Sequence, residues 1–121
     1  MKKSFVLVVV LCLFFTIFAG VALANTDYYT FNSTNYFDGV SIVSVTPPAG
    51  KTLKLHLYIE NEAGLYVWVS TSISGPWTQV AYWHGSGHHY TDLVSNTNGG
   101  TYYIRFLGAA THAYGGIYTE P

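Results

Sequence analysis

A cluster of aromatic and polar residues, YWHGSGHHY at positions 82–90, is the densest source of chemistry in this sequence. Two glycines in it let the backbone approach a ligand closely, and the rings offer wide apolar area beside imidazoles that can fix its orientation. The sequence therefore predicts a contact surface at these strand ends, formed by Trp77, Trp83, His84, His88, His89 and Tyr90. The alternative is that Trp77 and Trp83, on one face of the same strand, fill the core.

Imidazole and carboxylate side chains in and around this cluster could hold zinc or copper. The candidate ligands are His84, His88, Asp92 and His112. Three or four donors must converge on one ion, however, and adjacent residues of a strand, such as His88 and His89, point to opposite faces. We therefore expect surface histidines, with no bound metal and no cofactor.

Ser86 lies close in sequence to His84 and Asp92, so the residue types of a hydrolytic triad are present. Triads are assembled by the fold and not by sequence proximity, and GSG is not the strand-to-helix elbow of a hydrolase. No pattern identifies an oxyanion hole. We expect a protein that is not an enzyme.

Residues 1–24 have the layout of an export signal. Two lysines form a positive start, residues 5–18 are almost wholly apolar, and Ala22-Leu23-Ala24 ends the segment on small residues. We expect cleavage after Ala24, which gives a secreted, extracellular or periplasmic product. The alternative is an uncleaved membrane anchor, since the apolar run is long enough to span a bilayer.

The mature chain, residues 25–121, is expected to be a single domain without a membrane span. Its only candidate for a disulfide, Cys12, leaves with the signal. Loss of Lys2 and Lys3 changes the net charge from −1 to −3. Three dispersed basic residues cannot neutralise a run of phosphates, which argues against nucleic acid as a partner.

Aromatic residues make up 17 of the 97 residues after position 24, and eleven of them are tyrosines. Tyrosine hydroxyls need partners or water, so some of these rings must lie at the surface. Exposed rings beside polar groups suit stacking on sugars and equally suit a protein interface. Cross-strand pairing within the sheet is the purely structural alternative.

Short β-rich runs separated by turn residues predict one antiparallel β-sandwich, jelly-roll or Ig-like, of about seven or eight strands. The clearest run is TLKLHLYIE at 52–60, where apolar and polar residues alternate. Such alternation predicts a core that contains Leu53, Leu55, Leu57, Ile59, Val67, Val69, Ile104 and Phe106.

Two runs leave their geometry open. LYVWVSTS carries Tyr66 and Trp68 on its second face, which predicts either burial on both sides or an aromatic patch outside. A final strand at 114–119, separate from TYYIRFLG, is interrupted by Gly115-Gly116, where we expect a bulge or an edge at which the backbone bends.

The stretch LYVWVSTSISGPWTQV, followed by GGTYYIRFLG and a terminal GGIY, resembles secreted jelly-roll or galactose-binding-like β-sandwich modules. Its late YYIRFLG is also similar to bacterial pre-peptidase C-terminal domains. The resemblance covers about the last 55 residues and implies an extracellular binding accessory, often for carbohydrate or a cell surface. No site residue is carried over from these families.

The function that we expect is a small secreted binding module that contacts a glycan, a cell surface or a protein partner through an aromatic and histidine-rich face. The alternative is an antimicrobial or toxin-like effector that acts on the envelope of other cells. The negative charge of the mature chain lacks the cationic attraction that such effectors use.

Overall fold

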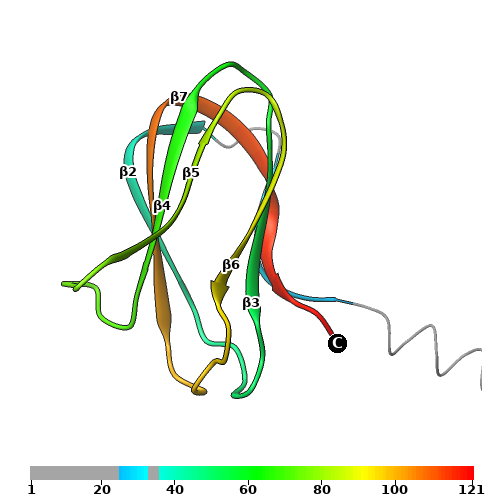
Figure 1. Ribbon diagram of the computed structural model, residues 1–121, viewed down its shortest axis with the longest axis vertical. Coiled ribbons are helices and arrows are strands. Elements are labelled where there is room, and N and C mark those ends of the chain that lie inside the picture. The colour runs from blue at the N-terminus through cyan, green and yellow to red at the C-terminus, as the bar shows by residue number, and fades with distance from the viewer. Residues whose placement is uncertain (1–24, 33–35) are drawn as a thin grey trace, which may run out of the picture.

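Seven antiparallel strands form the part of the chain that the computed structural model describes, residues 25–32 and 36–121 (Figure 1). The predicted export signal, residues 1–24, lies outside the described residues. In chain order the strands are β1 (Thr26–Phe31), β2 (Tyr36–Val45), β3 (Leu53–Ile59), β4 (Gly64–Ser70), β5 (Thr78–His84), β6 (Gly87–Val94) and β7 (Tyr102–Thr119). Within those ranges no helix is long and apolar enough to cross a membrane.

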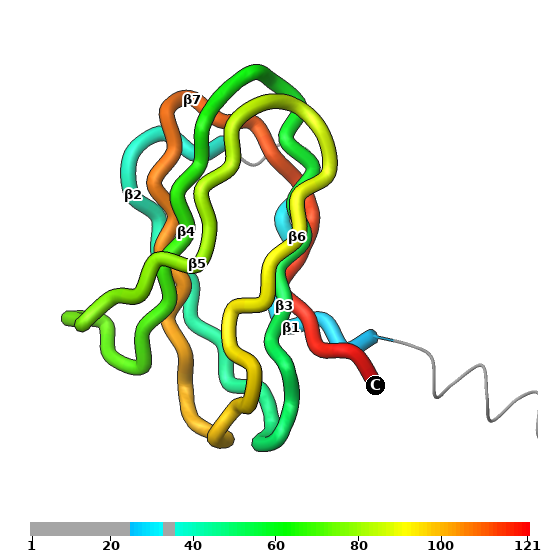
Figure 2. The backbone as a smooth tube through the Cα atoms, in the orientation of Figure 1, coloured from blue at the N-terminus to red at the C-terminus, as the bar shows by residue number. Residues whose placement is uncertain are grey.

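Strand β7 belongs to both layers of the fold. Its first part pairs with β4 and β2, which makes one sheet of order β5-β4-β7-β2. Its last part pairs with β3 and β1, which makes a second sheet of order β6-β3-β7-β1. Figure 2 shows the two layers, with β7 passing from one to the other over one end of the molecule. The predicted all-β sandwich is confirmed.

The crossing of β7 is centred on residues 108–111. Ala110 has a φ of 57°, a left-handed conformation that alanine rarely adopts. The amide of Asn61 donates to the carbonyl of Ala110 over 2.8 Å, and its oxygen accepts from the backbone N–H of His112 over 3.0 Å. A Cβ at Gly108 would come within 2.5 Å of the carbonyl oxygen of Phe37, so only glycine fits where β2 passes the bend.

The prediction of a separate last strand, bent or at an edge at Gly115-Gly116, was wrong. Strand β7 is continuous over 18 residues, and both glycines lie inside the second sheet between β1 and β3. A side chain at Gly115 would collide with the backbone carbonyl of His56. These glycines therefore allow the neighbouring strands to approach closely. The bend of β7 lies instead at residues 110–112, where Asn61 binds the backbone.

The core lies between the two sheets. Strand β3 alternates fully buried and half-buried residues along its whole length, as its sequence pattern predicts. Seven of the eight predicted core residues are fully buried: Leu53, Leu55, Leu57, Ile59, Val67, Ile104 and Phe106. Val69 is half-buried and packs against this core from the side. Both outer surfaces of the sandwich are therefore left to the second set of side chains on each strand.

Candidate functional site

The outer surface of the β5-β4-β7-β2 sheet carries a row of aromatic rings, which we call the Tyr66 face. It consists of Tyr66, Trp68, Trp77, Tyr82, Arg105 and Leu107, with Val40 and Ile42 beside them on β2. The Tyr66 ring lies 4.4 Å from that of Tyr82 and 5.6 Å from that of Trp68, centroid to centroid. Tyr66 and Tyr82 expose 38% and 49% of their surface. Of the two alternatives for this strand, the structure has the aromatic patch outside.

The middle of the Tyr66 face is organised by Arg105. Its guanidinium carbon lies 4.5 Å from the centroid of Trp68 and 4.5 Å from that of Trp77. The Nε atom is buried and has no hydrogen-bond partner among the described residues. Attraction between the cation and the two rings therefore holds Arg105 in place without a hydrogen bond from Nε.

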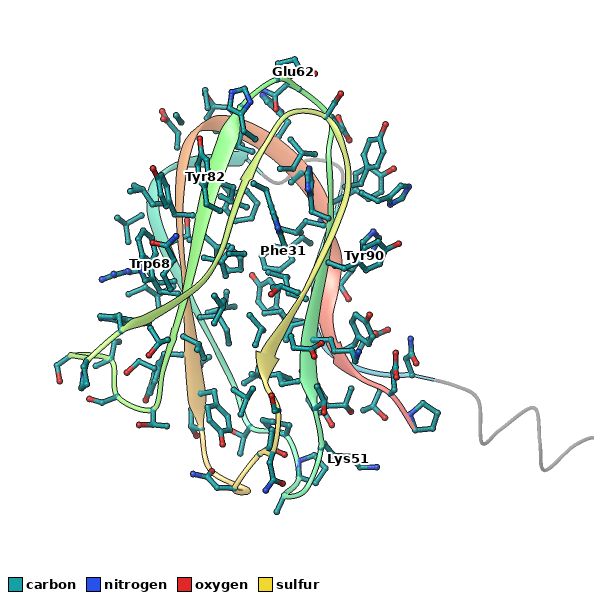
Figure 3. All side chains as sticks on the ribbon, viewed as in Figure 1. Phe31, Lys51, Glu62, Trp68, Tyr82 and Tyr90 are labelled. Atoms are coloured by element: carbon teal, nitrogen blue, oxygen red, sulfur yellow. The ribbon has the colours of Figure 1, made fainter. Side chains whose placement is uncertain are left out.

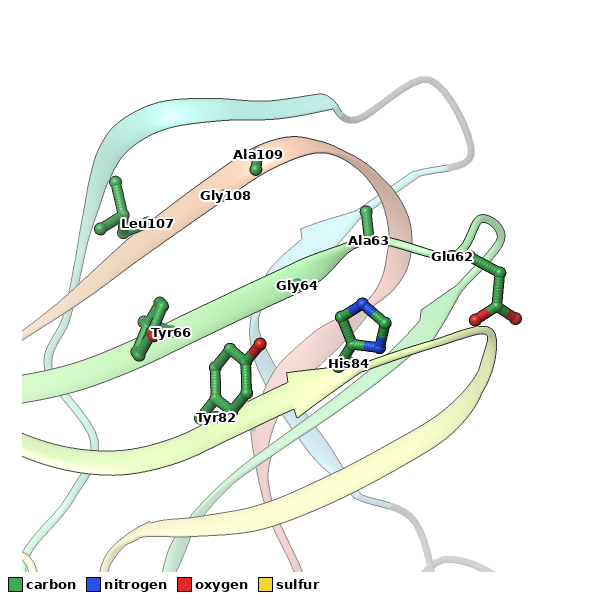
Figure 4. Close-up of a pocket in the computed structure, with 9 residues that line it drawn as sticks. All are labelled: Glu62, Ala63, Gly64, Tyr66, Tyr82, His84, Leu107, Gly108 and Ala109. Carbon is green, nitrogen blue, oxygen red and sulfur yellow. The ribbon is translucent and has the colours of Figure 1, made fainter.

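At one end of this face the surface is hollowed (Figure 4). The hollow has a volume of about 540 Å³. Tyr66 and Tyr82 form its aromatic side. Gly64 leaves room beside Tyr82, since a Cβ there would lie 3.2 Å from the Tyr82 hydroxyl. The lining residues are Glu62, Ala63, Gly64, Tyr66, Tyr82, His84, Leu107, Gly108 and Ala109.

Glu62 and His84 form the polar rim of the hollow. One carboxylate oxygen of Glu62 accepts a hydrogen bond from the Ser86 hydroxyl over 3.1 Å and a longer one from the Ser86 backbone N–H. These bonds tie the loop before β4 to the loop after β5. Figure 4 shows the His84 imidazole near the Tyr82 ring and Glu62 farther along the rim. Aromatic rings with polar groups at the edge of the same hollow are the combination that orients a ligand with hydroxyl groups.

The opposite sheet carries a second array, the His56 face: Lys54, His56, Tyr58, His88, Tyr90, Asp92, Tyr114 and Tyr118. Figure 3 shows Trp68 and Tyr90 on opposite sides of the sandwich. The His56 ring lies 4.4 Å from Tyr90 and 5.1 Å from His88, and its Nε2 is 2.8 Å from Nδ1 of His88. Burial first, and then the charge of His88, lower the pKa of His56 below 6.5.

The six residues predicted as one contact surface are divided among three places. Trp77 and His84 belong to the Tyr66 side, whereas His88 and Tyr90 are exposed on the His56 face. Trp83 and His89 are half-buried, their rings stack at 5.1 Å, and Trp83 packs against the core.

The prediction that Trp77 and Trp83 share a face was wrong. Opposite β4, the residue paired with Val67 is Ala81, but the residue paired with Trp68 is Gln79, so Val80 is an extra residue in β5. This bulge reverses the alternation. Trp83 therefore points inward, as the structural alternative proposed, and Trp77 lies outside against Arg105.

The four candidate metal ligands do not converge. Asp92 binds Lys54 at 3.3 Å, His112 packs on the ring of Tyr36, and His84 lies at the hollow of the other sheet. Nowhere in residues 25–32 and 36–121 do three or more His, Cys, Asp or Glu side chains form a metal-binding group. The histidine that meets His88 is His56, which the local sequence pattern around residues 82–92 could not indicate.

No protein-family model matches the chain, and no curated protein matches it. Several solved structures are similar in fold. TmCBM61 in complex with beta-1,4-galactotriose has a TM-score of 0.45 at 14% identity, covering 69% of this chain and 65% of that one. The chain thus spans less than two thirds of that structure.

Two further structures are similar at comparable scores. A variant of CBM29-2, a family 29 carbohydrate binding module, has a TM-score of 0.46 at 11% identity over 81% and 91% of the two chains. The CBM36-1 domain of a xylanase from the hindgut metagenome of Trinervitermes trinervoides has 0.44 at 19% identity over 83% and 90%. These likenesses lie in the course of the backbone.

Proposed function

We propose that this chain is a non-enzymatic binding module that holds a glycan on the Tyr66 face. The observation that carries the proposal is the row Tyr82, Tyr66 and Trp68, whose rings lie side by side next to a hollow with a polar rim. Sugar rings present apolar C–H faces that cover aromatic rings, and hydroxyls at their edges that need hydrogen-bond partners. The face supplies both.

The charges on this face favour a neutral glycan. The guanidinium of Arg105 is engaged by two tryptophan rings, and these cation–π contacts leave its charge less available to an acidic ligand than that of a free arginine. The one carboxylate among the described residues that line the hollow, Glu62, disfavours acidic sugars by repulsion. Neutral hydroxyl groups can instead donate to its oxygens.

The same carboxylate argues for binding without hydrolysis. Glycoside hydrolysis by the common mechanisms needs two carboxyl groups on either side of the scissile bond. Glu62 has no second carboxylate beside it among the lining residues, and its oxygen is engaged by Ser86. A ligand on this face would therefore be retained and not cleaved.

The size of the hollow also favours a glycan over a protein as the partner of this face. Stable protein interfaces bury about 800 Å² on each side around a dry centre. Here one end of the face is a depression of about 540 Å³ beside two tyrosines, with a carboxylate and an imidazole at its edge. One or two sugar rings fit such a depression better than a flat protein surface does.

Binding of the purified chain to a glycan array, followed by calorimetry with the glycan that is retained, tests the proposal. Tyr66→Ala and Tyr82→Ala should each weaken binding by about tenfold or more. Tyr90→Ala is the matched control, because it removes an exposed tyrosine from the opposite face. Retention of no neutral glycan, or equal losses in all three variants, would refute the Tyr66 face as a glycan site.

Export is part of the same proposal, because a glycan-binding module meets polymers outside the cell. Mass spectrometry of the secreted protein should give a chain that begins at Asn25. A culture-supernatant or periplasmic product that still carries Met1 would show that the export signal is not cleaved.

A further inference from the structure

We propose that His56 and His88 form a two-nitrogen binding site for Cu²⁺ on the His56 face, independent of the glycan-binding Tyr66 face. The two imidazoles come from different strands, β3 and β6. Nε2 of His56 lies 2.8 Å from Nδ1 of His88, so each ring directs one nitrogen at the other.

The strand register brings these rings together. His56 pairs with Tyr90 and Tyr58 pairs with His88, so the two histidines are diagonal neighbours on one face of an antiparallel pair. Tyr90 stacks on the outer side of His56 at 4.4 Å, and the edge of Tyr58 meets His88 at 4.7 Å. These ring contacts keep the two imidazoles next to each other on the sheet surface.

The separation of the two nitrogens suits a single metal ion. Imidazole nitrogens bind such ions at about 2.0 Å, and two of them in adjacent positions of a tetragonal site are then about 2.8–2.9 Å apart. The histidine nitrogens already have this separation. Binding requires the rings to turn so that both lone pairs face the ion, with the ring protons on the two outward nitrogens.

Both histidines must be neutral to donate to a metal. Asp27 and Tyr118 line the adjoining hollow together with His56, and Lys54 lies one pair further along β3, engaged by Asp92. Of these groups only Asp27 would attract a cation toward His56.

The donor set selects copper. Ca²⁺ requires oxygen ligands, and structural Zn²⁺ is held by four protein ligands, which no group of described residues supplies here. Cu²⁺ binds nitrogen most strongly among the divalent first-row ions and accepts water in its remaining tetragonal positions. A pair of imidazoles therefore provides a site for Cu²⁺ with positions open to solvent or to a further ligand.

Titration of the purified chain with Cu²⁺ at pH 7.4, followed by electron paramagnetic resonance and by calorimetry, tests this site. We expect one equivalent of tetragonal Cu²⁺ with coupling to two nitrogens. His56→Ala and His88→Ala should each weaken binding at least tenfold. His84→Ala and His112→Ala, which remove exposed histidines elsewhere, should leave it unchanged.

Circular dichroism of each variant establishes that it is folded, and the exposed position of His88 makes its variant the more secure of the two. Glycan binding, measured on the same samples, should not change with Cu²⁺. A copper spectrum that survives both substitutions would assign the ion to the chain terminus or another histidine and overturn the proposal. Binding of Zn²⁺ more tightly than Cu²⁺ would overturn the choice of metal.

Discussion

The guanidinium of Arg105 lies on the ring of Trp77, with its central carbon 4.5 Å from the ring centroid. Trp68 covers the guanidinium at the same distance from a second ring. Trp77 precedes β5, and Arg105 is in the first part of β7, so this contact attaches the segment before β5 to the sheet surface. Arg105 and Trp77 thereby form part of the Tyr66 face next to the exposed tyrosines of that face.

Replacement of Arg105 by alanine should lower the free energy of unfolding by about 1–3 kcal/mol, because two cation–π contacts and the packing of the arginine stem are lost. Tryptophan fluorescence should shift to the red as Trp77 becomes hydrated. Urea unfolding measures the change, with Lys51→Ala as a half-buried control that carries no ring contact. An Arg105→Met variant as stable as the unchanged protein would attribute the effect to packing alone.

Filling the hollow at Gly64 should abolish glycan binding without unfolding the chain. A Cβ at this position already lies 3.2 Å from the Tyr82 hydroxyl, so the larger side chain of Gly64→Leu must displace the end of the Tyr82 ring and occupy the hollow. Calorimetry should find no binding, while the free energy of unfolding, measured by thermal denaturation, changes by about 1 kcal/mol or less. Undiminished affinity would place the glycan away from the hollow.

In the metal-free protein, His56 should titrate below pH 6.5, because burial and then the charge of His88 lower its pKa. Histidine NMR measures the midpoint directly. His88→Gln should raise the midpoint toward 6.5 without reaching it, since burial remains. A midpoint that does not move would contradict the contribution of His88.

The same shift fixes the sign of the stability change with pH. The unfolded chain holds the His56 proton more tightly than the folded chain does, so protonation favours unfolding. The contribution of His56 to the free energy of unfolding is constant above pH 6.5 and decreases as the pH falls below 6.5. It levels off below the pKa of His56 in the folded chain. Urea unfolding of the unchanged protein and of His56→Gln between pH 7.5 and 5 should show a smaller loss in the variant.

The bend of β7 depends on Asn61. Asn61→Ala removes the hydrogen bonds to Ala110 and His112 and should lower the free energy of unfolding by about 1–3 kcal/mol. Asn96→Ala, at an exposed position outside the strands, should change it by less than about 0.5 kcal/mol. Similar effects of the two substitutions would show that the bend forms without this clamp.

Much of the fold could be predicted from the amino-acid sequence because period-two alternation is a local property. Leu53, Leu55, Leu57 and Ile59 must share a face in any extended strand, and that face is apolar enough to be buried. The strands that contain them and the two-layer arrangement follow from such patterns and from turn residues. The abundance of tyrosine likewise requires rings at the surface, since eleven hydroxyls cannot all find partners inside so small a core.

The tertiary structure alone decided which rings form each surface. The register between β3 and β6 brings His56 to His88, and the register between β4 and β5 brings Tyr66 to Tyr82. No local pattern specifies either register. One extra residue at Val80 turned Trp83 inward and left Trp77 outside. In a β-sheet the alternation of inward and outward residues depends only on the local sequence. Which side chains meet depends on strand register and bulges, and these are set by the packing of the whole sandwich.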